Sequence, residues 1–393
     1  MFGKKYSAVR VGIAGSGFMA GGILRALQQQ GFGLGPVLTR RPLNSVKEAP
    51  HPEVLTNSLA ELIEGSDVIV ICTGDSIHGT EVLEAAFQAG LPVVTLDSEL
   101  QITTGSWFVG KGILSEAEGD QPGSLAALRR DALAMGFEPL VYGNVKGFLN
   151  RTPTVEDMQY WSRKQGISPV QTTSFTDGTK LQIEQALVAN AFGATVLEQG
   201  MLGPKTENVA RGSQLLSNVA EYHGGAISDY VICPGFAGVF IGARHEEAQR
   251  PYLSYLKMGD GPFYTLLRHF HLCHLEVSKT VRDVVDQGES GILMNNGAKP
   301  RYSVAAIAKQ EMPKDHPISH AIGSFDLRGE AVAITDIQDH VPIGLIQQCR
   351  TTRHIEPGEI IRFKDVELPE TRALHIWREI ASGVGTSADL TPT

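Results

Sequence analysis

Short apolar runs alternate with amphipathic segments over the first 140 or so residues of the chain. The runs are rich in Val and Ile and have the length of strands that are buried on both faces. They lie at residues 9–14, 36–39, 67–72, 92–96, 113–115 and 139–142. The segments between them have helical spacing, and the segment 21–30 places Ile23, Leu24 and Leu27 on one face. Strands that alternate with helices predict an α/β fold with a doubly wound parallel sheet covered on both faces.

The alternation stops near residue 150, which indicates a second structural part. A helix is predicted at 181–194, and a strand, a glycine loop and a second strand are predicted at 230–242. After residue 300 the apolar runs are short and separated by turns, which predicts a small all-β unit; they lie at 304–308, 331–334, 343–346 and 359–363. We therefore expect domains at 1–150, 151–300 and 301–380, followed by a polar tail at 381–393 that is disordered.

The first apolar run leads into a Gly-x-Gly-x-x-Ala turn at residues 15–20, and a helix is expected after it. In the Rossmann fold, Gly15 would make the tight turn, Gly17 would let the backbone approach a pyrophosphate, and Ala20 would let helix and strand pack closely. The free N–H groups at the start of that helix would then face the phosphates. The candidate cofactor-binding residues are Gly15, Ser16, Gly17, Phe18 and Met19, with Thr39, Arg40, Arg41, Thr73 and Gly74 at two further strand ends.

The residues after the second strand indicate which dinucleotide binds. A site for NAD usually has Asp or Glu there to accept hydrogen bonds from the ribose hydroxyls, whereas this chain has Thr39-Arg40-Arg41. Two guanidinium groups and a hydroxyl suit a 2′-phosphate, which favours NADP(H). The competing interpretation is an ordinary basic loop.

Composition limits the other functions. The chain has 34 Lys and Arg against 43 Asp and Glu, a net charge of −9, and no basic block, so nucleic acid and anionic membranes are not expected partners. The four cysteines are scattered without a CxxC pair, which argues against a disulfide framework or a zinc ribbon. The N-terminus has no apolar core of a signal peptide and no run has the length of a membrane span, so a cytoplasmic location is expected.

Polar residues follow several predicted strands. Asp97 and Glu99 come after the strand 92–96, and Lys146 lies between two glycines after the strand 139–142. The stretch before the helix 181–194 holds Asp177 and Lys180. In one interpretation, Asp177 is a helix N-cap and Lys180 forms an ion pair with Glu184. In the other, Lys180 is a proton donor and Asp177 orients it.

The segment 259–264 is expected to lead into a helix that contains Arg268, His271 and His274. His271 and His274 would be one turn apart, which permits a metal site, but no second ligand cluster accompanies them. We favour Arg268 and His271 as polar groups that face an anionic substrate.

Several motifs, spread in order over residues 9 to about 377, carry a family resemblance. Besides the glycine turn they are Gly-Asp-Gln-Pro at 119–122, Phe-Thr-Asp-Gly-Thr-Lys at 175–180, Gly-Asp-Gly-Pro-Phe-Tyr at 259–264, Arg-x-x-His-Leu at 268–272, Pro-Ile-Gly-Leu at 342–345 and Ile-Glu-Pro-Gly-Glu at 355–359. Together they resemble the homoserine-dehydrogenase-like oxidoreductases that carry a C-terminal SAF domain. The best-known type of that family is the second class of 1-deoxy-D-xylulose 5-phosphate reductoisomerase.

The resemblance implies NADPH, a Rossmann domain, a catalytic domain that also dimerises, a SAF-like β domain at 301–380, and a polar carbonyl substrate. In the reductoisomerase type it also implies a divalent cation, Mg²⁺ or Mn²⁺. By motif match, Lys180, Lys146, Arg268 and His271 would line the substrate cleft. Asp97, Glu99 and Asp177 are the candidate oxygen ligands if a metal takes part.

The sequence therefore predicts an NADPH-dependent oxidoreductase that reduces, or isomerises and reduces, a small polyhydroxylated and anionic carbonyl compound. The alkoxide formed by hydride transfer needs a cation or acid beside it, and Lys180 is the first candidate. Two alternatives stay open at this point. One is a plain homoserine-like or sugar-acid dehydrogenase, and the other is an NADP-binding regulator without turnover.

Overall fold

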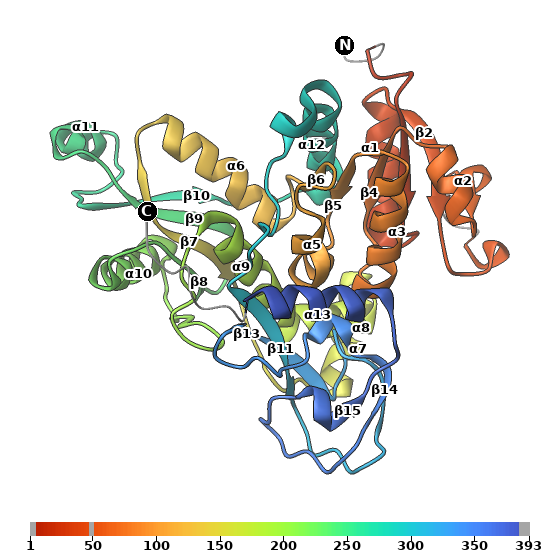
Figure 1. The fold of residues 1–393 in the computed structure, drawn as a ribbon. Helices are drawn as coiled ribbons and strands as arrows, with labels where there is room; N and C mark the ends of the chain where they lie inside the picture. Colours follow the sequence, from red (N-terminus) through yellow and green to blue (C-terminus); the bar gives the residue numbers. More distant parts are fainter. Residues whose placement is uncertain (1–4, 47–50, 385–393) are drawn as a thin grey trace. The chain divides into compact units, whose positions relative to one another are not determined.

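The computed structural model describes residues 5–46 and 51–384 of the 393-residue chain. The chain divides into two compact units that are each discontinuous in sequence (Figure 1). Unit 1 comprises Met1–Gly123, His271–Ala298 and Thr371–Trp377, and unit 2 comprises Ser124–Phe270, Lys299–Glu370 and Arg378–Thr393. None of the described helices is long and apolar enough to cross a membrane.

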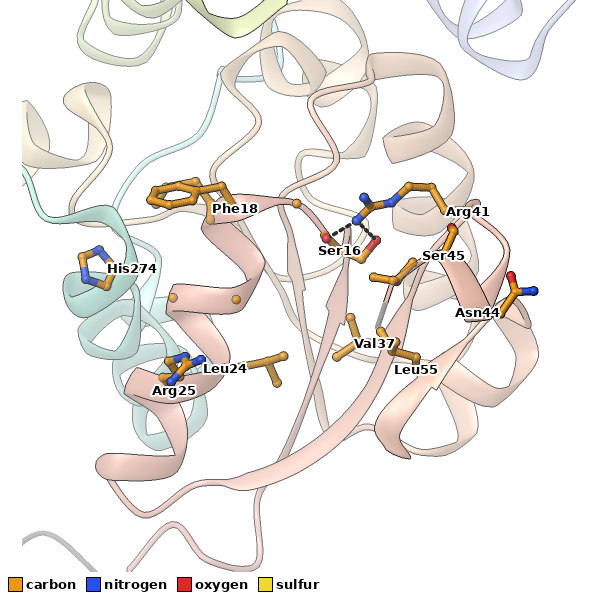
Figure 2. Close-up of a pocket in the computed structure, with 15 residues that line it drawn as sticks. Ser16, Phe18, Leu24, Arg25, Val37, Arg41, Asn44, Ser45, Leu55 and His274 are labelled. Atoms are coloured by element: carbon orange, nitrogen blue, oxygen red, sulfur yellow. Dashed lines mark hydrogen bonds between the residues drawn. The ribbon is translucent and has the colours of Figure 1, made fainter. Parts of the chain in front are cut away.

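Unit 1 contains a six-stranded parallel sheet with the strand order β3-β2-β1-β4-β5-β6. Its strands are β1 (Arg10–Ala14), β2 (Gly33–Leu38), β3 (Leu55–Thr56), β4 (Val68–Ile71), β5 (Val93–Thr95) and β6 (Leu114–Glu116). The helices of this unit include α1 (Phe18–Gln29), α2 (Leu59–Glu64), α3 (Ser76–Gln88), α4 (Ser98–Leu100), α5 (Ser106–Phe108) and α12 (Cys273–Gln287). The strand–turn–helix order at β1 and α1 (Figure 2) and the parallel sheet confirm the predicted Rossmann-type α/β fold.

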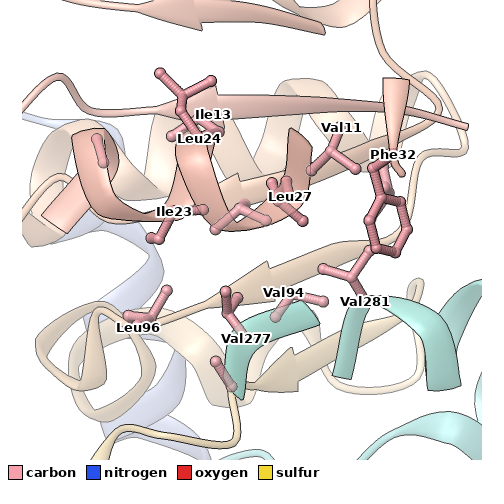
Figure 3. Close-up of a cluster of buried hydrophobic side chains, with 14 of the residues drawn as sticks. Val11, Ile13, Ile23, Leu24, Leu27, Phe32, Val94, Leu96, Val277 and Val281 are labelled. Atoms are coloured by element: carbon pink, nitrogen blue, oxygen red, sulfur yellow. The ribbon is translucent and has the colours of Figure 1, made fainter. Parts of the chain in front are cut away.

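The core of unit 1 forms where β1, α1 and β5 meet α12 (Figure 3). Ile23, Leu24 and Leu27 are almost fully buried, as the helical spacing predicted. They pack in one cluster with Val277 and Val281 of α12, a helix more than two hundred residues away in sequence. Burial of such side chains contributes about 1.5–3 kcal/mol each, so α12 is an integral part of this unit.

Unit 2 is built on a mixed four-stranded sheet with the order β10-β9-β7-β8. Its strands are β7 (Glu138–Lys146), β8 (Ile227–Ile232), β9 (Gly238–Arg244) and β10 (Phe263–Arg268). The helices are α6 (Gln121–Ala134), which begins at the boundary with unit 1, α7 (Val155–Gln165), α8 (Pro169–Thr176), α9 (Thr179–Phe192), α10 (Val209–His223) and α11 (Arg250–Tyr255). The strand–glycine loop–strand predicted at 230–242 corresponds to β8 and β9.

The assignment of the run 139–142 to the Rossmann sheet is wrong. This run belongs to β7, which pairs parallel with β8 and antiparallel with β9 in the second sheet. An apolar run only shows that a strand is buried, and its partners depend on residues about one hundred positions later in the chain. Likewise, α12 belongs with the Rossmann sheet although it follows the long central segment.

The residues after 300 form two small antiparallel sheets, as expected for a β-rich part. The first pairs β11 (Tyr302–Ala308) with β13 (Leu327–Ala333), and the second has the order β12-β14-β15. The strands of the second are β12 (Pro317–His320), β14 (Gln347–Thr351) and β15 (Val366–Glu367). The strand predicted at 343–346 is wrong, because Ile343–Leu345 form a 3₁₀ turn. Within 359–363, the structure shows only isolated bridges, at Ile360 and Arg362.

The helix α13 (Arg372–Val384) was not predicted, although its spacing of apolar residues is helical. Ala373, Leu374, Ile376 and Trp377 are buried on one face. The predicted disordered tail therefore starts too early, because residues 381–384 are helical. Its remaining part, 385–393, lies outside the described residues.

Candidate functional site

The glycine turn after β1 has the geometry that a dinucleotide site needs. Gly15 has a φ of +119°, and a Cβ on it would lie 2.4 Å from the carbonyl oxygen of Cys72, so only glycine is tolerated there. A Cβ on Gly17, in contrast, would meet nothing within 4 Å. The turn is thus packed tightly against β4 on one side and open at Gly17, where a phosphate would approach.

The start of α1 is suited to an anion. Gly17 is the N-cap of this 12-residue helix, no side chain caps it among the described residues, and its first turn carries no acidic residue. The first N–H groups of a helix have no partner within the helix and lie at the positive end of its dipole. The open space at Gly17 and these N–H groups therefore fit a pyrophosphate.

The end of β2 is joined to the glycine turn by hydrogen bonds (Figure 2). The hydroxyl of Ser16 donates to the Oγ1 of Thr39 over 2.6 Å, and Nη2 of Arg41 donates to Oγ of Ser16 over 3.0 Å and to the carbonyl oxygen of Ser16. The position where a carboxylate would select unphosphorylated ribose is thus occupied by the buried Thr39.

A cleft of about 700 Å³ lies along these residues (Figure 2). Its lining combines the start of α1 with the segment after β2, and it includes His274 from α12. The lining residues are Ser16, Gly17, Phe18, Met19, Gly21, Gly22, Leu24, Arg25, Val37, Arg41, Asn44, Ser45, Val46, Leu55 and His274. Five of the predicted cofactor-binding residues therefore line one cavity: Ser16, Gly17, Phe18, Met19 and Arg41.

Arg40 lies next to that cleft but contacts a different loop. Its Nη2 is 2.7 Å from Oδ2 of Asp75, whose side chain is 9% exposed whereas that of Arg40 is 60% exposed. The other carboxylate oxygen of Asp75 accepts hydrogen bonds from the N–H groups of Ile77 and His78 and so caps α3. Sequence reasoning missed Asp75, although an Asp before a helix is a recognisable N-cap signal.

Asp97 fixes the loop after β4. Its Oδ2 accepts hydrogen bonds from the N–H of Thr73 at 2.7 Å, from the hydroxyl of Thr73 at 2.6 Å and from the N–H of Gly74 at 3.0 Å. Glu99 is also buried, and a Cβ on Gly74 would be 3.8 Å from its Oε1. Over residues 5–46 and 51–384, no three His, Cys, Asp or Glu side chains are grouped to hold a metal ion, so the predicted metal role of Asp97 and Glu99 stays a prediction.

In unit 2, Asp177 forms a buried ion pair at the start of α9. Its Oδ2 is 2.5 Å from Nζ of Lys309, its Oδ1 accepts from the N–H of Thr179 at 2.8 Å, and the Asp177 and Lys309 side chains are 0% and 2% exposed. Burial lowers the pKa of Lys309 although Asp177 opposes this effect. Asp177 thus anchors the turn before α9, the helix that carries the half-buried Lys180.

Lys146 and Glu184 are brought together by the packing of β7 against α9. The Nζ of Lys146 is 3.6 Å from Oε2 of the fully buried Glu184, which also accepts a hydrogen bond from Nδ2 of Asn144 at 2.9 Å. Lys180 is four residues before Glu184, so both face the same side of α9. The structure thus pairs Glu184 with Lys146, whereas the sequence had indicated Glu184 as an ion-pair partner of Lys180.

The predicted helix containing Arg268 and His271 is wrong. Arg268 is the last residue of β10, and His271 lies in the connection before α12, which begins only at Cys273. The carboxylate of Glu276 accepts a hydrogen bond from the N–H of Leu272 at 2.7 Å and closes the first turn of α12 there. Arg268 lies over the ring of Phe270, with 5.0 Å between its Cζ and the ring centroid.

Residues 119–277, less than half of the chain, match a family model described as the catalytic domain of the oxidoreductase DRL. The match supports an oxidoreductase, and no curated protein matches the chain.

Solved structures with a similar fold include a homoserine dehydrogenase from Thiobacillus denitrificans, with 13% identity, a TM-score of 0.44, and coverage of 91% of this chain and 98% of that one. A UDP-N-acetylglucosamine 3-dehydrogenase from Acidithiobacillus ferrooxidans has 12% identity, a TM-score of 0.42, and coverage of 73% and 92%. A dehydrogenase from Clostridium difficile has 11% identity, a TM-score of 0.39, and coverage of 72% and 95%. These similarities concern the fold alone.

Proposed function

We propose that this protein is an NADPH-dependent oxidoreductase that reduces a small, polyhydroxylated and anionic carbonyl compound. The observation that carries the proposal is the cleft at the glycine turn, where Gly17 and the uncapped start of α1 adjoin Arg41. Thr39 occupies the position at which a carboxylate would favour NAD(H). The match of residues 119–277 to an oxidoreductase catalytic domain supports the same reaction class.

A nicotinamide cofactor supplies a hydride, and the protein must stabilise the alkoxide that this hydride creates at the former carbonyl oxygen. We assign this task to Lys180, on the first turn of α9, and to Lys146, which pairs with Glu184 of the same helix. One lysine would donate a proton to the alkoxide oxygen, and the other would neutralise an anionic group of the substrate. The buried carboxylate of Glu184 keeps Lys146 in place. Arg268 and His271 are further candidates for contacts with substrate anions.

The first experiment measures oxidation of NADPH and NADH by the purified protein with sugar phosphates, aldonic acids and aspartate semialdehyde, with and without Mg²⁺. Turnover of a ketose phosphate to a product with a rearranged carbon skeleton would identify a reductoisomerase, and a simple alcohol product would identify a plain dehydrogenase. NADPH binding without oxidation of any carbonyl compound would contradict the enzyme proposal and favour a regulator.

The role of Lys180 is tested by Lys180→Ala, with Lys299→Ala as the control because Lys299 is an exposed lysine of the same unit. We expect Lys180→Ala to keep NADPH affinity and to lower kcat by at least about 100-fold, the usual contribution of a positioned proton donor. An unchanged kcat removes Lys180 from the mechanism.

A further inference from the structure

We propose that a second cavity, at the carboxyl end of β8, binds an oxyanion group of the substrate, with Lys205 and Arg211 as its ligands. The inference rests on the proposed function, because it assumes that this chain reduces an anionic carbonyl compound. It adds a binding site to that function, since neither residue was predicted from the sequence.

The cavity has a volume of about 520 Å³ and lies between β8 and the start of α10, two neighbouring elements of unit 2 (Figure 1). Its polar lining comes from Lys205, Thr206 and Glu207, which precede α10, and from Arg211 in the first turn of that helix. All residues that line it belong to unit 2, so the cavity lies within one compact unit. Apolar residues complete its wall, among them Leu215, Ile232 and Pro234.

The backbone beside β8 holds Lys205 in place. The N–H of Ile232 donates to the carbonyl oxygen of Pro204 at 3.0 Å, and the N–H of Thr206 donates to the carbonyl oxygen of Ile232 at 2.9 Å. These two bonds pair Lys205 with Ile232 in parallel, as in an added strand. On the other side of Ile232, the parallel strand β7 places Lys146 in register with the same residue.

Lys146 and Lys205 therefore lie on either side of Ile232, two chain spacings apart. Neighbouring strands are about 4.8 Å apart, so the Cα atoms of the two lysines are separated by about 10 Å. Two long lysine side chains at this separation can contact one small molecule. A substrate whose oxyanion is held by Lys205 can thus present its carbonyl group towards Lys146.

The two cations of the cavity are available for an anion. Lys205 and Arg211 are exposed, and neither forms an ion pair with any residue in the ranges 5–46 and 51–384. Glu207 lies four residues before Arg211, but the structure shows no ion pair between these two described side chains. The lining therefore has a net charge of +1 on a chain whose net charge is −9.

The chemistry of this lining suits an oxyanion. A guanidinium group binds a carboxylate or a phosphate through two parallel N–H donors, and an ammonium group adds a second positive charge. The cavity also adjoins the start of the 15-residue helix α10, the positive end of its dipole. Glu207 opposes an anion there, so its charge provides a test of opposite sign.

The first test measures binding without turnover. Inorganic phosphate is titrated calorimetrically into the full-length protein with NADPH present, so that the cofactor occupies its own phosphate-binding cleft. Lys205→Ala and Arg211→Ala should each weaken phosphate binding at least about threefold, because each removes a charge-assisted contact in a solvent-exposed site. Glu207→Gln should strengthen phosphate binding, because it removes a like charge. The matched control is Lys299→Ala, an exposed lysine of the same unit, which should leave it unchanged.

The second test uses NADPH oxidation with the carbonyl compound that the unmodified protein turns over. Lys205→Ala and Arg211→Ala should raise KM at least about threefold and change kcat less than about twofold, because they bind the substrate away from its reacting carbonyl group. Glu207→Gln should lower KM. Lys180→Ala, in contrast, should lower kcat.

Three results would overturn the inference. Phosphate binding that is unchanged in both Lys205→Ala and Arg211→Ala, or weaker in Glu207→Gln, would exclude an anion site in this cavity. Phosphate binding that depends on both cations, together with an unchanged KM, would make the cavity an effector site and refute its assignment to the substrate. If the unmodified protein oxidises NADPH with no carbonyl compound, the proposed function and the substrate assignment both fail, and the phosphate titration still decides whether the cavity binds an anion.

Discussion

The buried ion pair between Asp177 and Lys309 allows a quantitative test of how unit 2 holds the start of α9. The oxygen and nitrogen atoms are 2.5 Å apart, and neither side chain is more than 2% exposed. Lys309 also donates to the carbonyl oxygen of Ser324 at 2.6 Å. Removing one partner leaves a charge in a nearly dry environment, which costs about 3–5 kcal/mol.

We therefore expect Asp177→Asn and Lys309→Met each to lower the free energy of unfolding of unit 2 by about 3 kcal/mol or more. The double variant has no buried charge at this place, and replacing both members of a buried pair is often neutral. Its loss should therefore be close to zero, about 6 kcal/mol smaller than the sum of the single losses.

The assay must report on unit 2 alone, because the chain has two units that need not unfold together. Amide hydrogen exchange of peptides from α9 and β11 meets this requirement, since both elements lie in unit 2. Single losses below about 0.5 kcal/mol, which are typical of surface substitutions, would refute the argument. Additive losses in the double variant would also refute it.

The pH dependence provides an independent check. Burial lowers the pKa of Lys309 from its ordinary value of 10.5, and the charge of Asp177 limits this decrease. In Asp177→Asn the pKa falls further, so between the folded value and 10.5 the unfolded state binds more protons than the folded state. The destabilisation caused by Asp177→Asn should therefore become smaller as the pH rises towards 10.5. If the destabilisation caused by Asp177→Asn stays constant or grows as the pH rises, the proposed effect of Asp177 on the pKa of Lys309 is wrong.

Three further outcomes are expected. Gly15→Ala should abolish NADPH binding in a fluorescence titration and destabilise unit 1 by about 1–3 kcal/mol. The reason is the positive φ of Gly15 and the clash of a Cβ with the carbonyl oxygen of Cys72. Retained NADPH binding would contradict the role of the turn. Burial raises the pKa of Asp229 from 3.8 to about 6, so its stabilising contribution is complete below about pH 4 and is lost as the pH rises through about 6. This loss amounts to about 3 kcal/mol, and a stability difference between the unmodified protein and Asp229→Asn that does not vary from pH 4 to 7 would exclude it. Asp97→Asn should increase hydrogen exchange at Thr73, because it weakens the hydrogen bonds that hold this residue. It should also reduce the free energy of NADPH binding by about 1.5–3 kcal/mol, whether or not Mg²⁺ is present. A reduction seen only with Mg²⁺ would make Asp97 a metal ligand instead.

The Rossmann part could be predicted because its signals are local. The run 9–14, the glycine turn and the face formed by Ile23, Leu24 and Leu27 lie within thirty residues, and each constrains the backbone by itself. The φ of Gly15 and the open space at Gly17 follow from the same short motif. The absence of an acidic residue after the second strand is likewise a local fact.

Other elements depend on partners that are distant in sequence. The run 139–142 was correctly predicted as a strand, but only pairing with β8 and β9 places it in the second sheet. Arg268 lies in a strand because β10 pairs along its whole length with β9, which outweighs the helical spacing that we read there. The helix α12 joins unit 1 because Val277 and Val281 fill the space beside α1.

The sequence by itself thus determined the fold class, the glycine turn and the basic segment after β2, since short-range backbone preferences and side-chain periodicity encode them. Only the tertiary structure decided the partners of the charged residues. It assigned Asp177 to Lys309, Lys146 to Glu184 and Arg40 to Asp75. The physical reason is that a charged side chain pairs with whichever oppositely charged group the folded chain brings within a few ångströms of it. The spacing of residues along the chain does not specify that group.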